Sequence, residues 1–133
     1  MAAVMNNRKS ANQYASVHTE SIVDEATPHA LIQMLMSGFL MQVNAAKGGI
    51  ARENFEEKST HISRAISIVG GLIDGIDLER GGVIAENLTR LYEYINTKLF
   101  QASAENSIEI LDEVGDLMSS VKEAWDAIPA EHR

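Results

Sequence analysis

The chain has 133 residues, a formal net charge of −8 at pH 7 and no cysteine. That length is typical of one domain with a single hydrophobic core. The acidic balance argues against binding to nucleic acid or to anionic membranes, which proteins contact through Lys and Arg. The lack of cysteine excludes a disulfide framework and thiolate metal sites, and it is consistent with a reducing cytosol.

The N-terminus shows no secretion signal. Arg8 and Lys9 follow a short apolar cluster, whereas a signal peptide has its positive charges before a longer apolar region. No apolar run in the chain approaches the roughly 18 residues that suggest a membrane span. We therefore expect a cytoplasmic protein without membrane insertion.

Residues 1–27 differ in composition from the rest of the chain. They are rich in Asn, Ser, Ala and Thr, and they hold a single aromatic residue, Tyr14. A segment this polar cannot bury enough apolar surface to form a core of its own. We predict a flexible N-terminal arm or cap, with a short helix near residues 21–23. Because the arm is tethered, even a weak contact of Tyr14 would keep it docked over an apolar groove in the free protein.

The placement of proline indicates a helical body. The only two prolines are Pro28 and Pro129, so the stretch between them has no helix-breaking residue. Thr27 is a suitable N-cap before a proline at the first helical position. Residues 28–129 are therefore predicted to be helical, and residues 130–133 form a tail.

Four runs of apolar residues follow one another in this body, each with a spacing of three or four residues. The first contains Leu31, Ile32, Leu35, Met36, Phe39, Leu40 and Val43. The second contains Phe55, Ile62, Ile66, Val69, Ile73 and Ile76. The third contains Ile84, Leu88, Leu91, Ile95 and Leu99. The fourth contains Leu111, Val114, Met118, Val121, Trp125 and Ile128. Short polar turns separate the runs, which predicts an all-α fold, an antiparallel up-down four-helix bundle.

The pair Gly81-Gly82 raises the question of a phosphate-binding loop. Such a loop needs a preceding strand and a Gly-rich pattern whose backbone N–H groups converge on the anion. Here the preceding segment is predicted to be helical, no Lys follows the glycines, and Glu79 and Glu86 flank them. The pair is interpreted as a turn at the end of a helix.

No catalytic or metal-binding pattern is present. The four histidines fall in different segments, and the predicted buried stripes carry no carboxylate that could act as an acid or base. Glu57 and His61 have the i, i+4 spacing of a helical metal pair. Without further ligands, however, they are better interpreted as a surface ion pair. We predict neither enzymatic activity nor a cofactor.

Some apolar residues lie outside the four predicted stripes. Tyr92, Tyr94 and Phe100 lie beside the third stripe, and Ile68 and Leu72 flank the second. Met34, Met36 and Met41 add adaptable side chains to the first helix. Two interpretations remain open: a surface groove that binds a partner, or a core wider than one narrow stripe.

Several motifs resemble the flagellar secretion chaperone family FliS, from about Asn12 to Ile128. They are "ANQYASV", "TPHALIQMLMSG", "RAISIVGGL", "DLERGGVIAENLTRLYEYI" and "EAWDAI". The order Gly-Gly, Asn-Leu and Leu-Tyr-x-Tyr within one helix start is the most specific of them. One departure is Ser37 before Gly38, where the family usually has Asp.

The resemblance implies a cytoplasmic export chaperone for flagellin. Members of the family bind the disordered C-terminal segment of flagellin, prevent its premature polymerisation and present it to the flagellar type III export gate. Binding of this kind requires an apolar surface on the chaperone that the incoming segment can cover.

By family position, six residues are expected to contact flagellin: Tyr14, Ile68, Leu72, Asn87, Tyr92 and Tyr94. The side-chain amide of Asn87 could pair with the backbone of an incoming segment, or with the first turn of its own helix. For Tyr92, packing in the core is a rival interpretation.

Two other classes of protein remain as alternatives. One is a structural homo-oligomeric bundle that buries its extra apolar surface against a copy of itself, which also leaves open a homodimer of the free protein. The other is a bundle enzyme or cofactor carrier, which the lack of suitable ligands disfavours.

Overall fold

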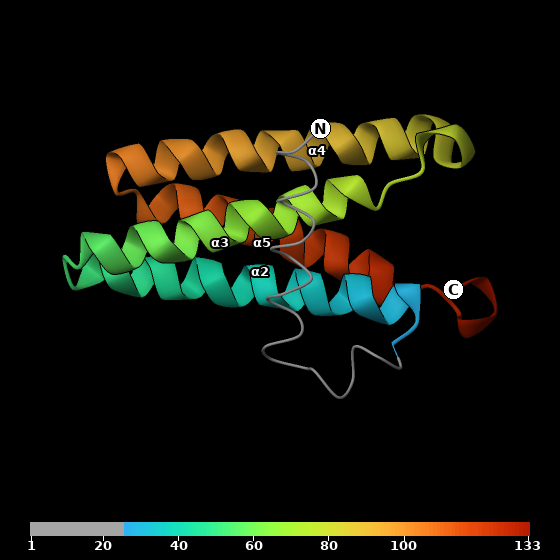
Figure 1. Cartoon of the computed structure of the whole chain (residues 1–133), viewed down its shortest axis with the longest axis horizontal. Helices are drawn as coiled ribbons and strands as arrows, with labels where there is room; N and C mark the ends of the chain where they lie inside the picture. Colours follow the sequence, from blue (N-terminus) through green and yellow to red (C-terminus); the bar gives the residue numbers. More distant parts are fainter. Residues whose placement is uncertain (1–25) are drawn as a thin grey trace.

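The computed structural model describes residues 26–133 (Figure 1). Four long helices follow one another: α2 (Pro28–Ala51), α3 (Phe55–Asp74), α4 (Leu78–Glu105) and α5 (Ile108–Asp126). A short 3₁₀ helix, η1 (Ala130–His132), ends the chain, and the described part contains no strand. The predicted all-α four-helix fold is confirmed. The predicted arm, its short helix and Tyr14 lie outside the described residues.

Each long helix begins at a side-chain cap. The oxygen of each capping residue accepts a hydrogen bond from a backbone N–H three residues further on, which satisfies one of the free donors in the first turn. The capping residues are Thr27, Asn54, Asp77 and Ser107, with donor–acceptor distances of 3.1 to 3.2 Å. Thr27 precedes Pro28 as the sequence predicts, and α4 ends at Asn106 in the left-handed conformation, with φ of 51°.

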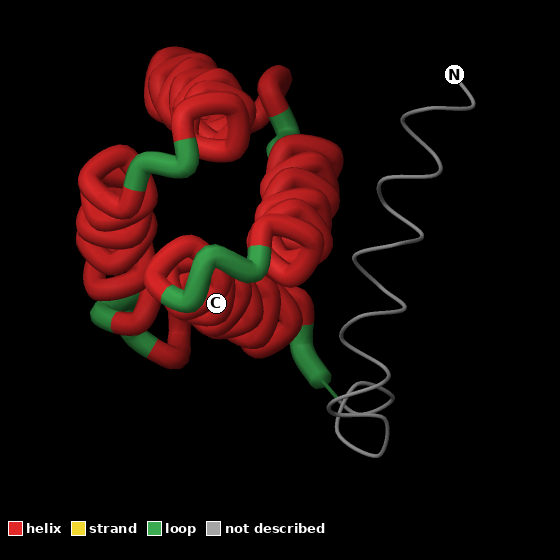
Figure 2. The backbone as a smooth tube through the Cα atoms, turned by 90° about the vertical axis from the view of Figure 1, so that its left-hand side faces the viewer, coloured by secondary structure: helices red, strands yellow, loops and turns green. Residues whose placement is uncertain are grey.

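The helices run alternately in opposite directions and close into a ring (Figure 2). α2 packs against α3 and α5, and α4 packs against the same two helices. Each helix contributes fully buried side chains to one core, among them Phe39, Ile62, Ile95 and Leu111. This is the up-down bundle that the short turns indicate.

The start of α4 differs from the prediction. The turn that joins α3 to α4 is at residues 75–77, and α4 begins at Leu78. Gly82 interrupts the helix with φ of 56° and ψ of −131°, a conformation that glycine adopts far more readily than other residues. Ile84 was predicted to be buried in the third stripe, but it is 79% exposed. The prediction for Ile84 is therefore wrong.

The end of the bundle where α2 begins and α5 ends is closed by Trp125. Its ring stacks on the His29 ring with centroids 4.6 Å apart, and its indole N–H donates to the His29 carbonyl over 3.0 Å. Burial lowers the pKa of His29, as does the nearby charge of Arg133, against the opposing effect of Asp126. The imidazole is therefore neutral at pH 7.

Replacing Trp125 with alanine is expected to lower the free energy of unfolding by about 2 to 3 kcal/mol. The loss is smaller than for a fully buried tryptophan because part of the indole is exposed. Urea unfolding followed by far-UV circular dichroism would measure it. A variant as stable as the wild type would mean that the stack on His29 does not hold the two helices together.

At Gly115, by contrast, a substitution is expected to raise the stability of the bundle. This residue lies in the middle of α5, and a methyl group there would meet only Val43 Cγ1 within 4 Å, at 3.8 Å. Because alanine is the better helix former and has room, Gly115→Ala is expected to raise stability by about 0.5 to 1 kcal/mol. The same urea titration measures this gain, and a loss of stability would show that the space beside Val43 is smaller than described.

Candidate functional site

Exposed apolar side chains concentrate on α4. Eight large hydrophobic residues in the described chain are exposed, and five of them belong to this helix. They are Leu78, Val83, Ile84, Tyr94 and Phe100. Isolated exposed hydrophobic residues are common on proteins, but a group on one element indicates an interaction surface.

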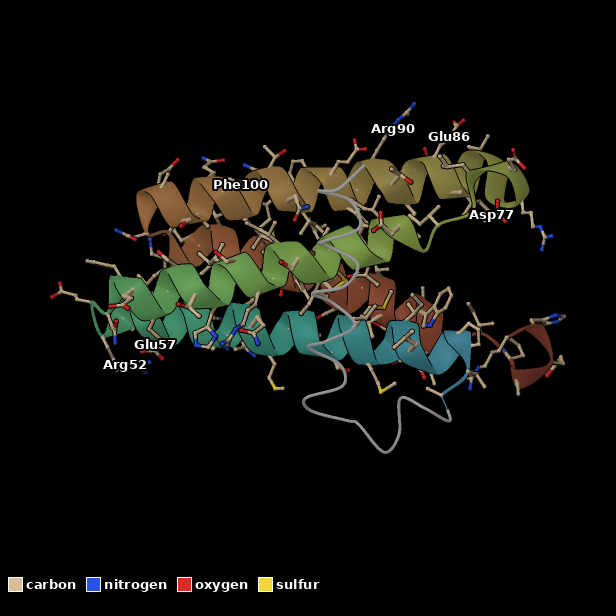
Figure 3. All side chains as sticks on the ribbon, in the orientation of Figure 1. Arg52, Glu57, Asp77, Glu86, Arg90 and Phe100 are labelled. Atoms are coloured by element: carbon tan, nitrogen blue, oxygen red, sulfur yellow. The ribbon has the colours of Figure 1, made fainter. Side chains whose placement is uncertain are left out.

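Helical spacing places some of these residues on one side of α4. Val83, Asn87 and Tyr94 are separated by four and seven residues, so they share a face after the Gly82 interruption. Ile84 lies beside this face. We call these four residues the outer face of α4. Glu86 and Arg90 point away from the bundle on the same helix, so the apolar residues are bordered by charges of both signs (Figure 3).

Most of the outer face lies near the beginning of α4, where this helix separates from α5. The two helices are close together near the end of α4 and diverge toward its beginning (Figure 1). In the part where they diverge, Leu88 on α4 and Leu117 and Val121 on α5 pack against the core but remain only partly buried. The divergence explains why Ile84 is exposed although its position follows the buried stripe of α4.

Tyr94 connects α4 to α5. Its hydroxyl donates to Glu113 Oε2 over 2.6 Å, while the side chain remains 42% exposed. Lys98 Nζ lies 5.6 Å from the centre of the ring. The hydrogen bond to Glu113, together with burial and the Glu113 charge, raises the pKa of Tyr94. The ring is therefore held in a fixed position on the surface, where a partner can pack against it.

Asn87 is exposed on the same face. None of the side-chain hydrogen bonds between described residues involves its amide. A side-chain amide of this kind can both donate and accept hydrogen bonds. Asn87 and Tyr94 are the two predicted contact residues that the structure brings together at the surface.

Three other predicted contact residues are buried. They were predicted to lie at the surface, beside the buried stripes of their helices, and that prediction is wrong. Ile68 is 1% exposed, and Leu72 and Tyr92 are each 2% exposed. The physical reason is that α3 and α4 each pack against two neighbours, so both edges of each stripe are covered. Burial raises the pKa of Tyr92 to about 12. For these residues, the wider core is the correct interpretation.

Val83 and Ile84 were not predicted to be surface residues. One signal was present: neighbouring residues on a helix point about 100° apart, so an adjacent apolar pair at a helix start cannot both face a narrow core. Their positions directly after Gly82 and before Glu86 reinforce that signal.

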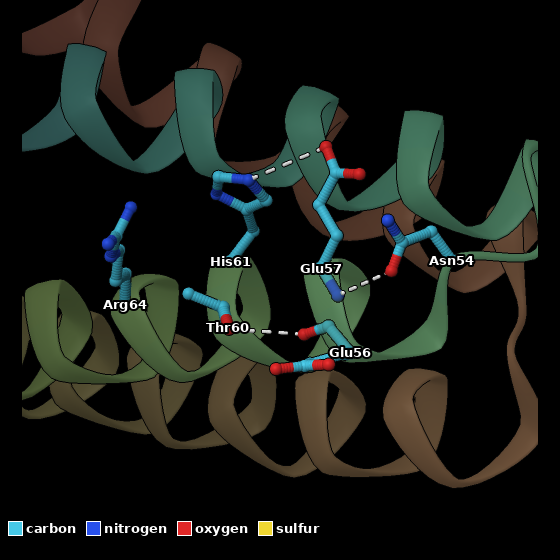
Figure 4. Close-up of a pocket in the computed structure, with 6 residues that line it drawn as sticks. All are labelled: Asn54, Glu56, Glu57, Thr60, His61 and Arg64. Carbon is cyan, nitrogen blue, oxygen red and sulfur yellow. Dashed lines mark hydrogen bonds and ion pairs between the residues drawn. The ribbon is translucent and has the colours of Figure 1, made fainter.

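A polar hollow near the start of α3 is the other site with titratable groups (Figure 4). His61 Nε2 lies 3.9 Å from Glu57 Oε1, a distance at which the predicted i, i+4 ion pair forms when the imidazole is protonated. Arg52 also binds Glu57, over 2.7 Å, and Gln42 Oε1 lies 2.7 Å from His61 Nδ1. These polar side chains are therefore paired with one another. In residues 26–133, no group of three or more His, Cys, Asp or Glu side chains could hold a metal ion.

Within the same described range, no helix is long and apolar enough to cross a membrane. The amphipathic helices of this bundle instead bury their apolar sides against one another.

Comparison with known proteins gives a consistent result. The family model of the flagellar protein FliS matches residues 10–132. Flagellar secretion chaperone FliSB of Pseudomonas aeruginosa is 46% identical over 120 residues, which cover 90% of this chain and 95% of the relative. Flagellar secretion chaperone FliS of Salmonella typhimurium is 40% identical, with 86% of each chain covered. The FliS of Vibrio cholerae is 33% identical, with 94% of this chain and 92% of the relative covered.

The fold agrees with the sequence comparisons, because the match extends over all four described helices. The chain therefore belongs to the FliS family of flagellar secretion chaperones.

Proposed function

We propose that the protein is a cytoplasmic export chaperone that binds the disordered C-terminal segment of flagellin. Bound in this way, flagellin cannot polymerise prematurely and is delivered to the flagellar type III export apparatus. The observation that carries this proposal is the exposed apolar surface on α4 in a chain of this family. The function requires no cofactor and no bond-making step.

The size of the surface bears on how flagellin binds. A segment that folds on binding loses about 2 to 5 kcal/mol to ordering, so its interface should exceed the roughly 1,600 Å² of an ordinary complex. The outer face of α4 cannot supply that area alone. Further exposed apolar residues lie on the other three helices, namely Met41, Phe55 and Ile108. A flagellin segment that wraps around the bundle could cover several of them.

The predicted contact residues fall into two groups, those that contact flagellin directly and those that act from within the core. Asn87 and Tyr94 contact flagellin directly, together with Val83 and Ile84. Ile68, Leu72 and Tyr92 act indirectly, because they fix the positions of α3 and α4 from within the core. Tyr14 remains a predicted contact in the N-terminal segment.

Light scattering tests the proposal. The purified protein is mixed with flagellin from the same organism, or with flagellin that lacks its C-terminal segment, and the mass of the complex is measured. A complex of defined mass is expected only with intact flagellin. If neither flagellin binds and the free protein is itself an oligomer, the homo-oligomeric alternative is correct instead.

Tyr94→Ala is expected to weaken binding of the flagellin segment about tenfold, because truncating a surface aromatic anchor removes at least 1 kcal/mol of binding free energy. The bundle should lose only about 1 kcal/mol of stability, which corresponds to the hydrogen bond to Glu113. Calorimetric titration with the segment and urea unfolding measure the two effects. Tyr94→Phe keeps the ring and serves as the control, and a large loss of stability with unchanged affinity would contradict the proposed role.

A further inference from the structure

The beginning of α4 forms a corner with the rest of the helix. Asp77 caps it: its Oδ1 accepts a hydrogen bond from the Arg80 N–H over 3.2 Å, and its carbonyl accepts one from the Gly81 N–H over 2.9 Å. Gly82 then departs from helical geometry, with φ of 56° and ψ of −131°. We call residues 78–81 the first turn of α4. This turn and the helix that continues after Gly82 are two segments joined at the corner.

Gly81 brings the first turn into close contact with Ala85. A Cβ atom added to Gly81 would lie 2.5 Å from the Ala85 Cβ, a separation that real Cβ atoms do not adopt. In a regular helix, residues four apart have Cβ atoms roughly 5 to 6 Å apart. Gly81 has no positive φ, so it is the contact with Ala85, and not the backbone conformation, that requires glycine at this position.

The corner also changes the surroundings of Leu78. Four residues follow one another at intervals of seven, so a straight helix would place all of them on its buried side. They are Leu78, Ala85, Tyr92 and Leu99. The last three are buried, but Leu78 is 53% exposed. The break at Gly82 therefore moves a leucine from the buried side of α4 to the surface.

Exposed apolar side chains lie on both segments that the corner joins. Leu78 belongs to the first turn, whereas Val83 and Ile84, which are 70% and 79% exposed, begin the helix after Gly82. Glycine is a poor helix former, so the corner lowers the stability of the free protein. A partner that crosses the corner covers apolar side chains on both segments. The proposed flagellin segment has to cover more area than the outer face of α4 offers, and the first turn adds to that area.

We propose that Gly81 is a positioning residue for flagellin binding. Because it allows the first turn to pack against Ala85, it places Leu78 where the flagellin segment can cover it together with the outer face of α4. Flagellin is the partner that fits, because the first turn leads directly into that face. The inference rests on the proposed function and extends its binding site. Leu78 contacts flagellin directly, whereas Gly81 and Ala85 act through the position of Leu78.

Moving one methyl group between two positions tests the inference. Gly81→Ala puts two methyl groups closer than they can approach, so the first turn has to move. The affinity for the flagellin C-terminal segment, measured by calorimetric titration, is expected to fall about tenfold. Leu78→Ala removes the direct contact and should also weaken binding about tenfold.

The double variant Gly81→Ala, Ala85→Gly again has a single methyl group at the contact. Its affinity should return to within about threefold of the wild-type value. The second substitution makes the helix less stable, because glycine replaces alanine. Recovered affinity therefore cannot come from recovered stability. The NMR signals of the Leu78 methyl groups should shift in Gly81→Ala and return in the double variant.

Gly49→Ala is the matched control for a steric clash elsewhere. Its added Cβ would lie 2.9 Å from the Lys58 backbone nitrogen, where α2 is joined to α3 at the opposite end of the bundle (Figure 1). The stability of this variant should fall, but the affinity of the folded protein should change less than about threefold. Circular dichroism confirms that each variant is folded, and urea unfolding gives its stability.

Three results would overturn the inference: wild-type affinity of a folded Gly81→Ala or Leu78→Ala variant, a double variant as weak as Gly81→Ala, or an equal loss of affinity in Gly49→Ala. The proposed function is tested separately by the wild-type protein. If it binds the flagellin segment and Ile84→Glu weakens that binding, the proposed function stands even where the inference about Gly81 fails. If the wild-type protein does not bind flagellin, both are wrong.

Discussion

Replacing Tyr92 with alanine is expected to lower the free energy of unfolding by about 3 to 5 kcal/mol. Tyr92 is among the largest side chains that the core encloses, with 2% of its surface exposed. Removing its ring leaves a cavity that the surrounding helices can close only in part. Since a domain of this kind is typically stable by about 5 to 15 kcal/mol, the variant should lose a substantial fraction of its stability. Urea and thermal unfolding would measure the loss.

Tyr92→Phe is the matched control, because it keeps the ring and removes the hydroxyl. Its stability at pH 7 should stay within about 1 kcal/mol of the wild type. If Tyr92→Ala were as stable as Tyr92→Phe, Tyr92 would be a surface residue, as its predicted role in flagellin binding implies. Tyr94→Ala provides the contrast, since it should lose only about 1 kcal/mol of stability while its affinity for flagellin falls.

Tyr92→Phe should also differ from the wild type in how its stability depends on pH. Burial raises the pKa of Tyr92 from 10.0 to about 12, so the folded state favours the protonated phenol. This contribution to stability is fully present below pH 10, and it is lost as the pH rises toward 12. Tyr92→Phe lacks the titrating group. Its stability should therefore fall less steeply than that of the wild type across this range.

The helical architecture could be predicted because its signals are local. Thr27 before Pro28 marks the first helix start, and the spacing of Leu111, Val114 and Met118 gives the buried side of α5. Each of these features depends on residues within one or two turns of a helix. The order of the four helices and their short turns then leave few arrangements other than an up-down bundle.

The division between core and surface was harder to predict, because it depends on how many neighbours each helix has. Ile68 and Leu72 fall outside a narrow stripe, yet both are buried, since α3 packs against both α2 and α4. Ile84 continues a stripe, yet it is exposed, since α4 and α5 diverge there. Periodicity describes one helix at a time, so it cannot report the distance between two helices.

The functional surface combines features that only the folded chain brings together. Asn87 and Tyr94 could be proposed from the family motif, whereas Val83 and Ile84 become surface residues through the break at Gly82 and the divergence of α4 from α5. A surface of this kind leaves apolar side chains of the free protein in contact with water. When a partner covers these side chains, the burial of their apolar area contributes favourably to the binding free energy. The outer face of α4 is therefore where a substitution should affect binding most and folding least.

Ile84→Glu is expected to reduce the affinity for the flagellin C-terminal segment by about 30- to 1,000-fold, which corresponds to about 2 to 4 kcal/mol. The substitution removes an apolar contact and places a carboxylate in an interface that excludes water, where an unpaired charge is costly. The stability of the free protein should change by less than about 0.5 kcal/mol, because Ile84 is 79% exposed and its side chain contributes little to the core. Calorimetric titration and urea unfolding measure the two quantities.

Met41→Glu is the matched control for this prediction. Met41 is also an exposed apolar residue, at 52%, but it lies on α2 rather than on the outer face of α4. Both variants gain one negative charge, so a general repulsion of flagellin by a more acidic chaperone would weaken both equally. A loss that is at least tenfold greater for Ile84→Glu than for Met41→Glu would locate the main contact on α4. Equal losses would indicate general charge repulsion rather than a contact at Ile84, and a loss only for Met41→Glu would show that flagellin binds the bundle mainly through another face.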